Sequence, residues 1–393
     1  MHSRQAFAVA ASLLVAILVV GCSSTPEREL SRVPARYATL PNGHDPLNPE
    51  QITPLYAELR AAGGNLVRGL ERVNGRPLEI LSLSGGGQNG AFGAGFLVGW
   101  RESGRRPRFD AVSGVSTGAL LATHALLGTP EDDVALERMY TEVERKDIYK
   151  QRSVFGLLSG TDSLMDTAPL RQLIADYITE ETLARVAAAA DERRLLFVGT
   201  TNIDYEQTWV WNMSLIAKDG DLELYRDVLL ASASFPIVFP PVEIDGHLFV
   251  DGAVRSNLVV AGLAGETPPG PPLHGPGNLY LIDNGKQENP PEALRRALGD
   301  VAAMTLSAMM TQSMQTALTR TYVGARALGY NFKLVSIEPH VEIGKDSLAF
   351  DPDEMRAAFD AGRALARQED PWQPRPSRSN DLPVWADELI RIP

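Results

Sequence analysis

The sequence predicts an α/β fold in which helices cover a mainly parallel central sheet. From Leu78 onward, short apolar segments typical of buried strands alternate with longer segments of helical periodicity. Of the 393 residues, 44% are hydrophobic and 22% are charged, which is the composition of a globular protein with a buried core. We therefore expect a folded region that begins near residue 78.

The expected elements follow from these two periodicities in chain order. Strands are predicted at 78–83, 109–112, 195–200, 208–213, 248–250, 279–282 and 332–337. Helices are predicted at 91–101, 118–127, 132–145, 169–179 and 302–322. The strands on either side of residues 204–207 are expected to form an antiparallel hairpin at an edge of the sheet.

The N-terminus predicts export and lipidation. Arg4 precedes an apolar or small-residue run at 6–20, which is short for a membrane-spanning helix but suits a signal peptide. Val19-Val20-Gly21-Cys22 resembles the bacterial lipobox, and Cys22 is the only cysteine. We expect residues 1–21 to be a lipoprotein signal peptide and Cys22 to carry acyl chains that anchor the protein. Ser23 fits export to the outer membrane; an uncleaved anchor helix or an incidental free thiol are the alternatives.

Composition divides the rest of the chain into three regions. Residues 22–77 are polar and broken by prolines, and we expect a tether with a docking helix at about 55–70. Residues 78–345 are expected to form the main domain, with a proline-rich surface loop at 265–278. Residues 346–393 are expected to form a C-terminal helix and a proline-rich tail lying on the domain.

The net charge of -12 argues against a nucleic-acid partner.

A glycine run follows the first predicted strand. Gly85, Gly87 and Gly90 satisfy the G-x-G-x-x-G pattern of a dinucleotide site. Such a site needs an acidic residue at the end of the next strand, and residues 114–118 (GVSTG) occupy that place instead. No Gly-Lys-Ser/Thr follows the run, which excludes a P-loop. We therefore expect no nucleotide partner and interpret the run as a source of backbone amides for an oxyanion.

The Gly-x-Ser-x-Gly pattern at 114–118 predicts a nucleophile elbow. It lies between an apolar strand and a helix, so a sharp turn would expose the hydroxyl of Ser116. Gly114 and Gly118 would be small because the backbones of the strand and the helix pass close to the turn. The helix N-terminus below Ser116 favours developing negative charge.

A nucleophilic serine needs a general base, and Asp251 is the best candidate. A predicted strand delivers Asp251 at its C-terminal end, the edge of an α/β sheet where sites assemble, and Gly252 lets the chain turn there. His124 is about 12 Å along the helix from Ser116 and cannot reach it. A triad of Ser116 with Asp251 or Asp283 and His340 stays open as an alternative, with His274 as a further candidate base.

These motifs, in this order, resemble those of the patatin-like phospholipases. The matching segments are Gly85-Gly86-Gly87-Gln88-Asn89-Gly90, the elbow at 114–118 and Asp251-Gly252-Ala253. The resemblance implies a three-layer α/β/α acyl-hydrolase domain at 78–345, with its motifs within 81–258. It further implies a dyad of Ser116 as nucleophile and Asp251 as proton acceptor, with the backbone of Gly86 and Gly87 as the oxyanion hole and no cofactor.

The expected function is therefore that of a lipid-anchored serine acyl hydrolase of the bacterial envelope. Its substrates would be phospholipids, lysophospholipids or related acyl esters. Asn89 departs from the Arg or Lys that many family members carry, which leaves the substrate class open; Leu258 stands where a proline often follows the asparagine. A catalytically silent lipid-binding lipoprotein is a further alternative. No spacing typical of a metal site occurs.

Three secondary features have less specific interpretations. Leu306, Met310, Met314 and Leu318 form a stripe along a helix, which is typical of a core face and alternatively of an acyl groove. Asp283-Asn284-Gly285 after a strand reads as a turn, although its carboxylate could reach the site. Gly93 and Gly95 are expected to let their helix lie close to the sheet.

Overall fold

The computed structural model describes residues 38–39, 70, 74–152, 162–260, 274–287, 296–344 and 346–377. The predicted signal peptide, Cys22, the docking helix apart from Leu70 and most of the proline-rich loop lie outside these residues. Among the described helices, none is both long and apolar enough to cross a membrane.

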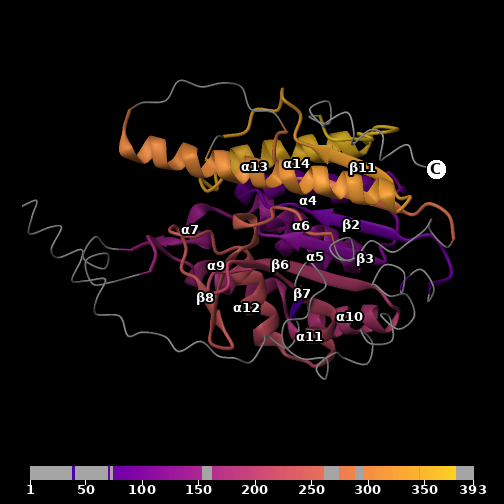
Figure 1. Cartoon of the computed structure of the whole chain (residues 1–393), viewed down its shortest axis with the longest axis horizontal. Helices are drawn as coiled ribbons and strands as arrows, with labels where there is room; N and C mark the ends of the chain where they lie inside the picture. Colours follow the sequence, from indigo (N-terminus) through magenta and orange to yellow (C-terminus); the bar gives the residue numbers. More distant parts are fainter. Residues whose placement is uncertain are drawn as a thin grey trace, which may run out of the picture.

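A nine-stranded sheet forms the centre of the molecule (Figure 1). The strands run in the order β1-β7-β6-β3-β2-β10-β11, and β9 pairs with β6 and with β8. The pairs from β6 to β11 along this path are parallel, whereas those that involve β1, β7, β8 and β9 are antiparallel. The expected mainly parallel sheet is confirmed. The bounds are β1 Ala38–Thr39, β2 Glu79–Leu83, β3 Ala111–Val115, β6 Leu195–Asn202, β7 Gln207–Asn212, β8 Val242–Ile244, β9 His247–Asp251, β10 Asn278–Asp283 and β11 Asn331–Ser336.

Helices cover both faces of this sheet, which gives three layers. Leu81 and Val112 pack on one face with most of the helices, and Ile80 and Leu281 pack on the other face with α13. A separate ribbon joins β4 (Lys150–Gln151) to β5 (Met165–Asp166). The helices are α4 Gly90–Glu102, α5 Thr117–Leu127, α6 Pro130–Thr141, α7 Arg145–Ile148, α9 Ala168–Tyr177, α10 Glu180–Asp191, α11 Met213–Lys218, α12 Leu222–Ser232, α13 Leu298–Ala327 and α14 Pro352–Ala366, with short 3-10 turns η2 Gly87–Asn89 and η3 Gly252–Val254.

Side-chain caps explain why one strand and two helices have other bounds in the structure than the sequence predicts. The strand expected at 208–213 ends at Asn212, whose side chain accepts from the amide of Leu215 and starts α11. The helix expected at 169–179 ends earlier because Thr179 caps α10, a helix that was not predicted; α12 was not predicted either. The helix expected at 132–145 is divided into α6 and α7, since the amide of Glu144 bonds the Asp147 carboxylate and starts a new turn.

The C-terminal helix α14 is part of the main core and packs directly on α4. A Cβ atom at Gly95 of α4 would overlap the backbone of Phe359, and one at Gly362 would overlap the backbone of Phe92. Gly95 therefore serves the contact with α14 and not, as expected, a contact with the sheet. Since α14 shares this core, the boundary expected after residue 345 falls inside the packed domain.

The described part of the C-terminal tail lies on the domain, as expected. The ring of Trp372 packs against Trp100 with centroids 4.9 Å apart. Gln373 and Leu334 exchange backbone hydrogen bonds of 2.8 and 3.0 Å, which extends pairing beyond β11. The tail to Ser377 is thus held by packing and by the sheet edge.

Candidate active site

Ser116 lies in a strained turn between β3 and α5. Its φ is 55°, a left-handed value that non-glycine residues rarely adopt outside functional turns. A Cβ at Gly114 would overlap the backbone of Gly118, so the tight turn requires glycine there. The amide of Ser116 donates to Ser232 Oγ (2.9 Å), and this hydroxyl donates to Gly199 O (2.7 Å). The local structure is the elbow that the sequence predicts.

The sheet brings Asp251 to Ser116 through the long strand β6. The parallel pairing of β3 with β6 ends where Val115 opposes Gly199. On β6, the next residue is Thr200, and it opposes Asp251 at the end of the antiparallel strand β9. One edge of this part of β6 is already paired with β7. β9 therefore pairs with the other edge, just beyond the point where the pairing with β3 ends. The C-terminal ends of β3 and β9 therefore meet.

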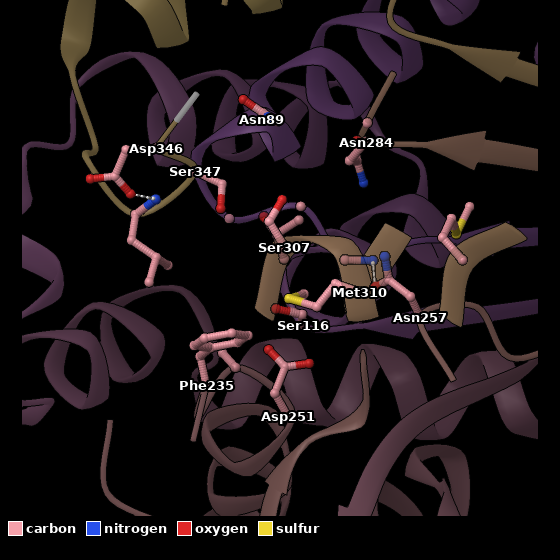
Figure 2. Close-up of a pocket in the computed structure, with 18 of the residues that line it drawn as sticks. Asn89, Ser116, Phe235, Asp251, Asn257, Asn284, Ser307, Met310, Asp346 and Ser347 are labelled. Carbon is pink, nitrogen blue, oxygen red and sulfur yellow. Dashed lines mark hydrogen bonds between the residues drawn. The ribbon is translucent and has the colours of Figure 1, made fainter. Parts of the chain in front are cut away.

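The side chains of Ser116 and Asp251 point toward one another (Figure 2). Asp251 is 2% exposed, and this burial raises the pKa of its carboxyl to about 7. Hydrogen bonding from Ser116 and from the amide of Ala253 (2.8 Å) opposes the rise. A carboxyl with a pKa near neutrality, beside a hydroxyl, has the properties of a general base.

In the glycine loop between β2 and α4, two backbone N–H groups have no acceptor within the described part of the chain. Buried amides nearly always have a partner, so each can be accounted for in turn. Among the described residues, no acceptor exists for the N–H groups of Gly86 and Gly87. The other amides of the loop donate to Ile282 O (from Ser84, 3.0 Å), Asn257 Oδ1 (from Gly85, 3.0 Å), Ser347 O (from Gln88, 2.8 Å), Gly86 O (from Asn89, 3.1 Å) and Gly87 O (from Gly90).

These two amides belong to a loop that touches the elbow. A Cβ built on Gly85 would lie 2.9 Å from Ser116 Cβ, so the loop and the serine are in direct contact. Gly87 has a φ of 57°, which a side chain would strain. Gly86 and Gly87 line the same cavity as Ser116, so their free N–H groups can serve an oxygen atom bound there.

The cavity around these residues has a volume of about 1570 Å³. One wall is apolar and comes mainly from α5, α6, α9 and the segment after α12. A second wall is the middle of α13, from Met304 to Thr319, which contributes three methionines and Leu318. The apolar residues of the two walls include Leu120, Met139, Val143, Ile148, Leu170, Leu173, Phe235, Val238, Phe239, Met304, Met310, Met314 and Leu318.

The methionine stripe of α13 belongs to the core, as one interpretation of the sequence predicts, and part of it also lines the cavity. Met314 and Leu318 are buried in the core cluster of that face of the sheet and also line the cavity. Met310 is partly buried and lines it as well, whereas the side chain of Leu306 is not among those described.

None of the described residues that line the cavity is a histidine. His340 lies outside the cavity, with its side chain 76% exposed, and His274 is also exposed. His124 is buried, and its Nδ1 lies 2.9 Å from Asp132 Oδ1. His247 is buried beside Trp209 and Tyr205. The triad alternative with His340 or His274 therefore has no support in this geometry.

Three polar residues around the site were not predicted as parts of it. Ser232 holds the amide of Ser116, and Asn257 and Asn284 bond the glycine loop. Asp283, expected as a turn residue, is 3% exposed and lines the cavity; burial raises the pKa of its carboxyl to about 7. Asn89 also lines the cavity. No group of three or more possible metal ligands occurs in the described part of the chain.

Comparison with known proteins identifies the family of the segment that carries the site. The model of the patatin-like phospholipase family matches residues 81–264. These residues form a patatin-like phospholipase domain. The match includes the glycine loop, the elbow and Asp251, and the layered mixed α/β fold agrees with it.

The chain was also compared with solved structures and with curated proteins. Among solved structures, VipD from Legionella pneumophila is similar at 14% identity with a TM-score of 0.39. The similarity covers 74% of this chain and 66% of the VipD chain, so the chain spans just under two thirds of VipD. No curated protein matches the chain.

Proposed function

We propose that the protein is a lipid-anchored serine acyl hydrolase of the bacterial envelope that works through a Ser116–Asp251 dyad. The observation that carries the proposal is the meeting, in one cavity, of a strained serine, a buried carboxyl and two amides that have no acceptor among the described residues. The match of residues 81–264 to the patatin-like phospholipase family supports a lipid acyl hydrolase.

The proposed reaction begins with attack of Ser116 Oγ on the ester carbonyl, while the Asp251 carboxylate accepts the hydroxyl proton. The carbonyl oxygen becomes an oxyanion, and the N–H groups of Gly86 and Gly87 donate to it. Asp251 then returns the proton to the leaving alcohol, and the acyl group stays on Ser116. Water, deprotonated by Asp251, releases the acid.

The walls of the cavity favour a substrate with long acyl chains. Its apolar side chains suit hydrocarbon, and the methionines of α13 can adapt to chains of different shape. On the exposed side of the same helix, Met309 is 65% exposed next to the cavity-lining Met310. Phospholipids, lysophospholipids or related acyl esters are the proposed substrates.

The experiment that tests this function is analysis of lipid products. Purified wild-type protein and Ser116→Ala are incubated with phosphatidylethanolamine vesicles and with a lysophospholipid, and released fatty acid is measured. We expect acid only with the wild type. Equal release by Ser116→Ala would contradict the proposal, and binding of the vesicles without any hydrolysis would favour a silent lipid-binding protein.

The proposed anchor is tested separately. Cys22 is the proposed site of acylation, with residues 1–21 removed and the mature protein held at the outer membrane. Cells that express the wild type should incorporate labelled palmitate into the protein and retain it in the outer-membrane fraction. Cys22→Ala should lose the label and leave that fraction; retained label in this variant would contradict lipidation at Cys22.

A further inference from the structure

Asn284, in the turn after β10, bonds residues on both sides of the glycines, Ser84 before them and Gly93 in the first turn of α4. Its side-chain Nδ2 donates to Ser84 O (2.7 Å), before the glycines, and its Oδ1 accepts from the amide of Gly93 (3.1 Å), after them. Its backbone amide also donates to Ser84 Oγ (2.9 Å). Asn284 is 0% exposed, so none of these bonds competes with solvent.

The middle of the loop rests directly on the same residue. A Cβ at Gly86 would lie 2.8 Å from Asn284 Cβ and would overlap its carbonyl oxygen. The backbone of Gly86 is therefore pressed against Asn284, which leaves little freedom to rotate the peptide that carries its N–H group. One asparagine thus fixes the start, the middle and the end of the segment.

Asn257 holds the loop at a further point. Its Oδ1 accepts from the amide of Gly85 (3.0 Å), and its own amide donates to Ser313 Oγ on α13 (3.3 Å). Ser313 Oγ in turn donates to the carbonyl of Ala253, two residues after Asp251 (3.1 Å). Asn257 thereby connects the glycine loop to the segment that carries the proposed base.

We propose that Asn284 and Asn257 are positioning residues that aim the N–H groups of Gly86 and Gly87 at the substrate oxygen. Asn284 satisfies a carbonyl and an amide with one short side chain, so only the two central amides are left without a partner among the described residues. The inference rests on the proposed function, because the aimed groups matter only if an oxyanion forms beside Ser116.

The test compares Asn284→Ala and Asn257→Ala with a matched control, Asn212→Ala. Asn212 is also a buried asparagine whose Oδ1 accepts from a backbone amide, that of Leu215 (3.2 Å), but it does not line the cavity. For each variant, kcat and KM are measured with a short-chain chromogenic ester. Amide hydrogen exchange of the peptide that covers residues 84–93 and the melting temperature are measured on the same samples.

We expect each clamp variant to lower kcat by about 100-fold and to change KM by less than about threefold, because misplaced amides weaken only the transition state. Exchange at 84–93 should accelerate in both. The control should lose thermal stability while it keeps kcat and the exchange of this peptide.

The proposal is overturned if either folded variant retains kcat within about threefold of the wild type, or if exchange at 84–93 is unchanged. Two variants with different bonds to the loop keep the test available if one fails to fold. If the wild type hydrolyses no ester, the proposed function fails, and the exchange data still decide whether the clamp exists.

Discussion

Ser116 and Asp251 meet because β3 and β9 end at consecutive residues of β6. Val115 opposes Gly199 and Asp251 opposes Thr200, so one strand sets the register of both segments. Gly252 completes the arrangement, because a Cβ there would lie 2.6 Å from Gly199 O. The pair is thus held by hydrogen-bonded backbone, which is more rigid than a pair carried on loops.

The raised pKa of Asp251 predicts how turnover depends on pH. A base must be ionised to accept the proton of Ser116, and burial raises the pKa of Asp251 to about 7. We expect kcat/KM for a chromogenic ester to rise with pH and to level off above about pH 7. A profile that is flat from pH 5 to 9, roughly, would contradict the assignment of the base.

Asp283 supplies a matched control for that profile. It is buried, lines the same cavity and has a pKa raised to about 7, yet it is not assigned as the base. Asp283→Asn should therefore keep the pH profile of the wild type, whereas Asp251→Asn should lose turnover at every pH. If Asp283→Asn abolished the rise with pH, Asp283 would be the titrating base.

The same shift predicts how stability depends on pH. The pKa of Asp251 is higher in the folded protein than its ordinary value of 3.8, so folding favours the protonated form. The stability that this group contributes is complete below about pH 4 and is lost as pH rises to about 7. Asp251→Asn should raise the melting temperature above pH 7 and leave it nearly unchanged at pH 4, as measured by calorimetry. An equal effect at both pH values would show that Asp251 does not titrate in this way.

Histidine substitutions should leave turnover intact. His340 and His274 are exposed and outside the described lining of the cavity, so His340→Ala and His274→Ala should change kcat by less than about twofold. His124→Ala should lower the melting temperature, because His124 bonds the buried Asp132. A large loss of kcat in folded His340→Ala or His274→Ala would restore the triad.

Filling the cavity from α13 should shorten the preferred acyl chain. Met314 is 7% exposed and lines the cavity, so Met314→Trp would occupy space that a long chain needs. We expect the ratio of kcat/KM for long-chain over short-chain esters to fall about tenfold. Met309→Trp, on the exposed side of the same helix, is the control and should keep the ratio. A fall in both variants would mean that the methionines lining the cavity do not determine the preferred length of the acyl chain.

Local motifs made much of the candidate site predictable. The elbow around Ser116 and the glycine loop each occupy a few adjacent residues. Glycines in the sequence mark the positions where the backbone of these segments leaves no room for a side chain. Asp251 was predicted as the end of a strand in a parallel sheet; β9 is instead antiparallel to β6, and its end meets the end of β3 because Asp251 opposes Thr200. The hairpin of β6 and β7 was equally predictable, since its turn is local.

The residues that were missed depend on contacts between distant segments. Asn284 looks like an ordinary turn residue until β10 is placed beside β2, which brings it under Gly86. Ser232 ends α12 and gives no local sign that it will bond Ser116. Gly95 was assigned to the sheet because the contact of α4 with α14 joins residues far apart in the chain. The sequence also leaves His340 open as a base, because the distance of this residue from the cavity depends on the three-dimensional structure.

The most direct test of the dyad is reaction with a fluorophosphonate, followed by mapping of the adduct by mass spectrometry. We expect one adduct, on Ser116, that is absent in Ser116→Ala and forms at least about 100-fold more slowly in Asp251→Asn. Asp283→Asn should be labelled at the rate of the wild type. An adduct on another residue, or labelling of Asp251→Asn as fast as the wild type, would contradict the dyad.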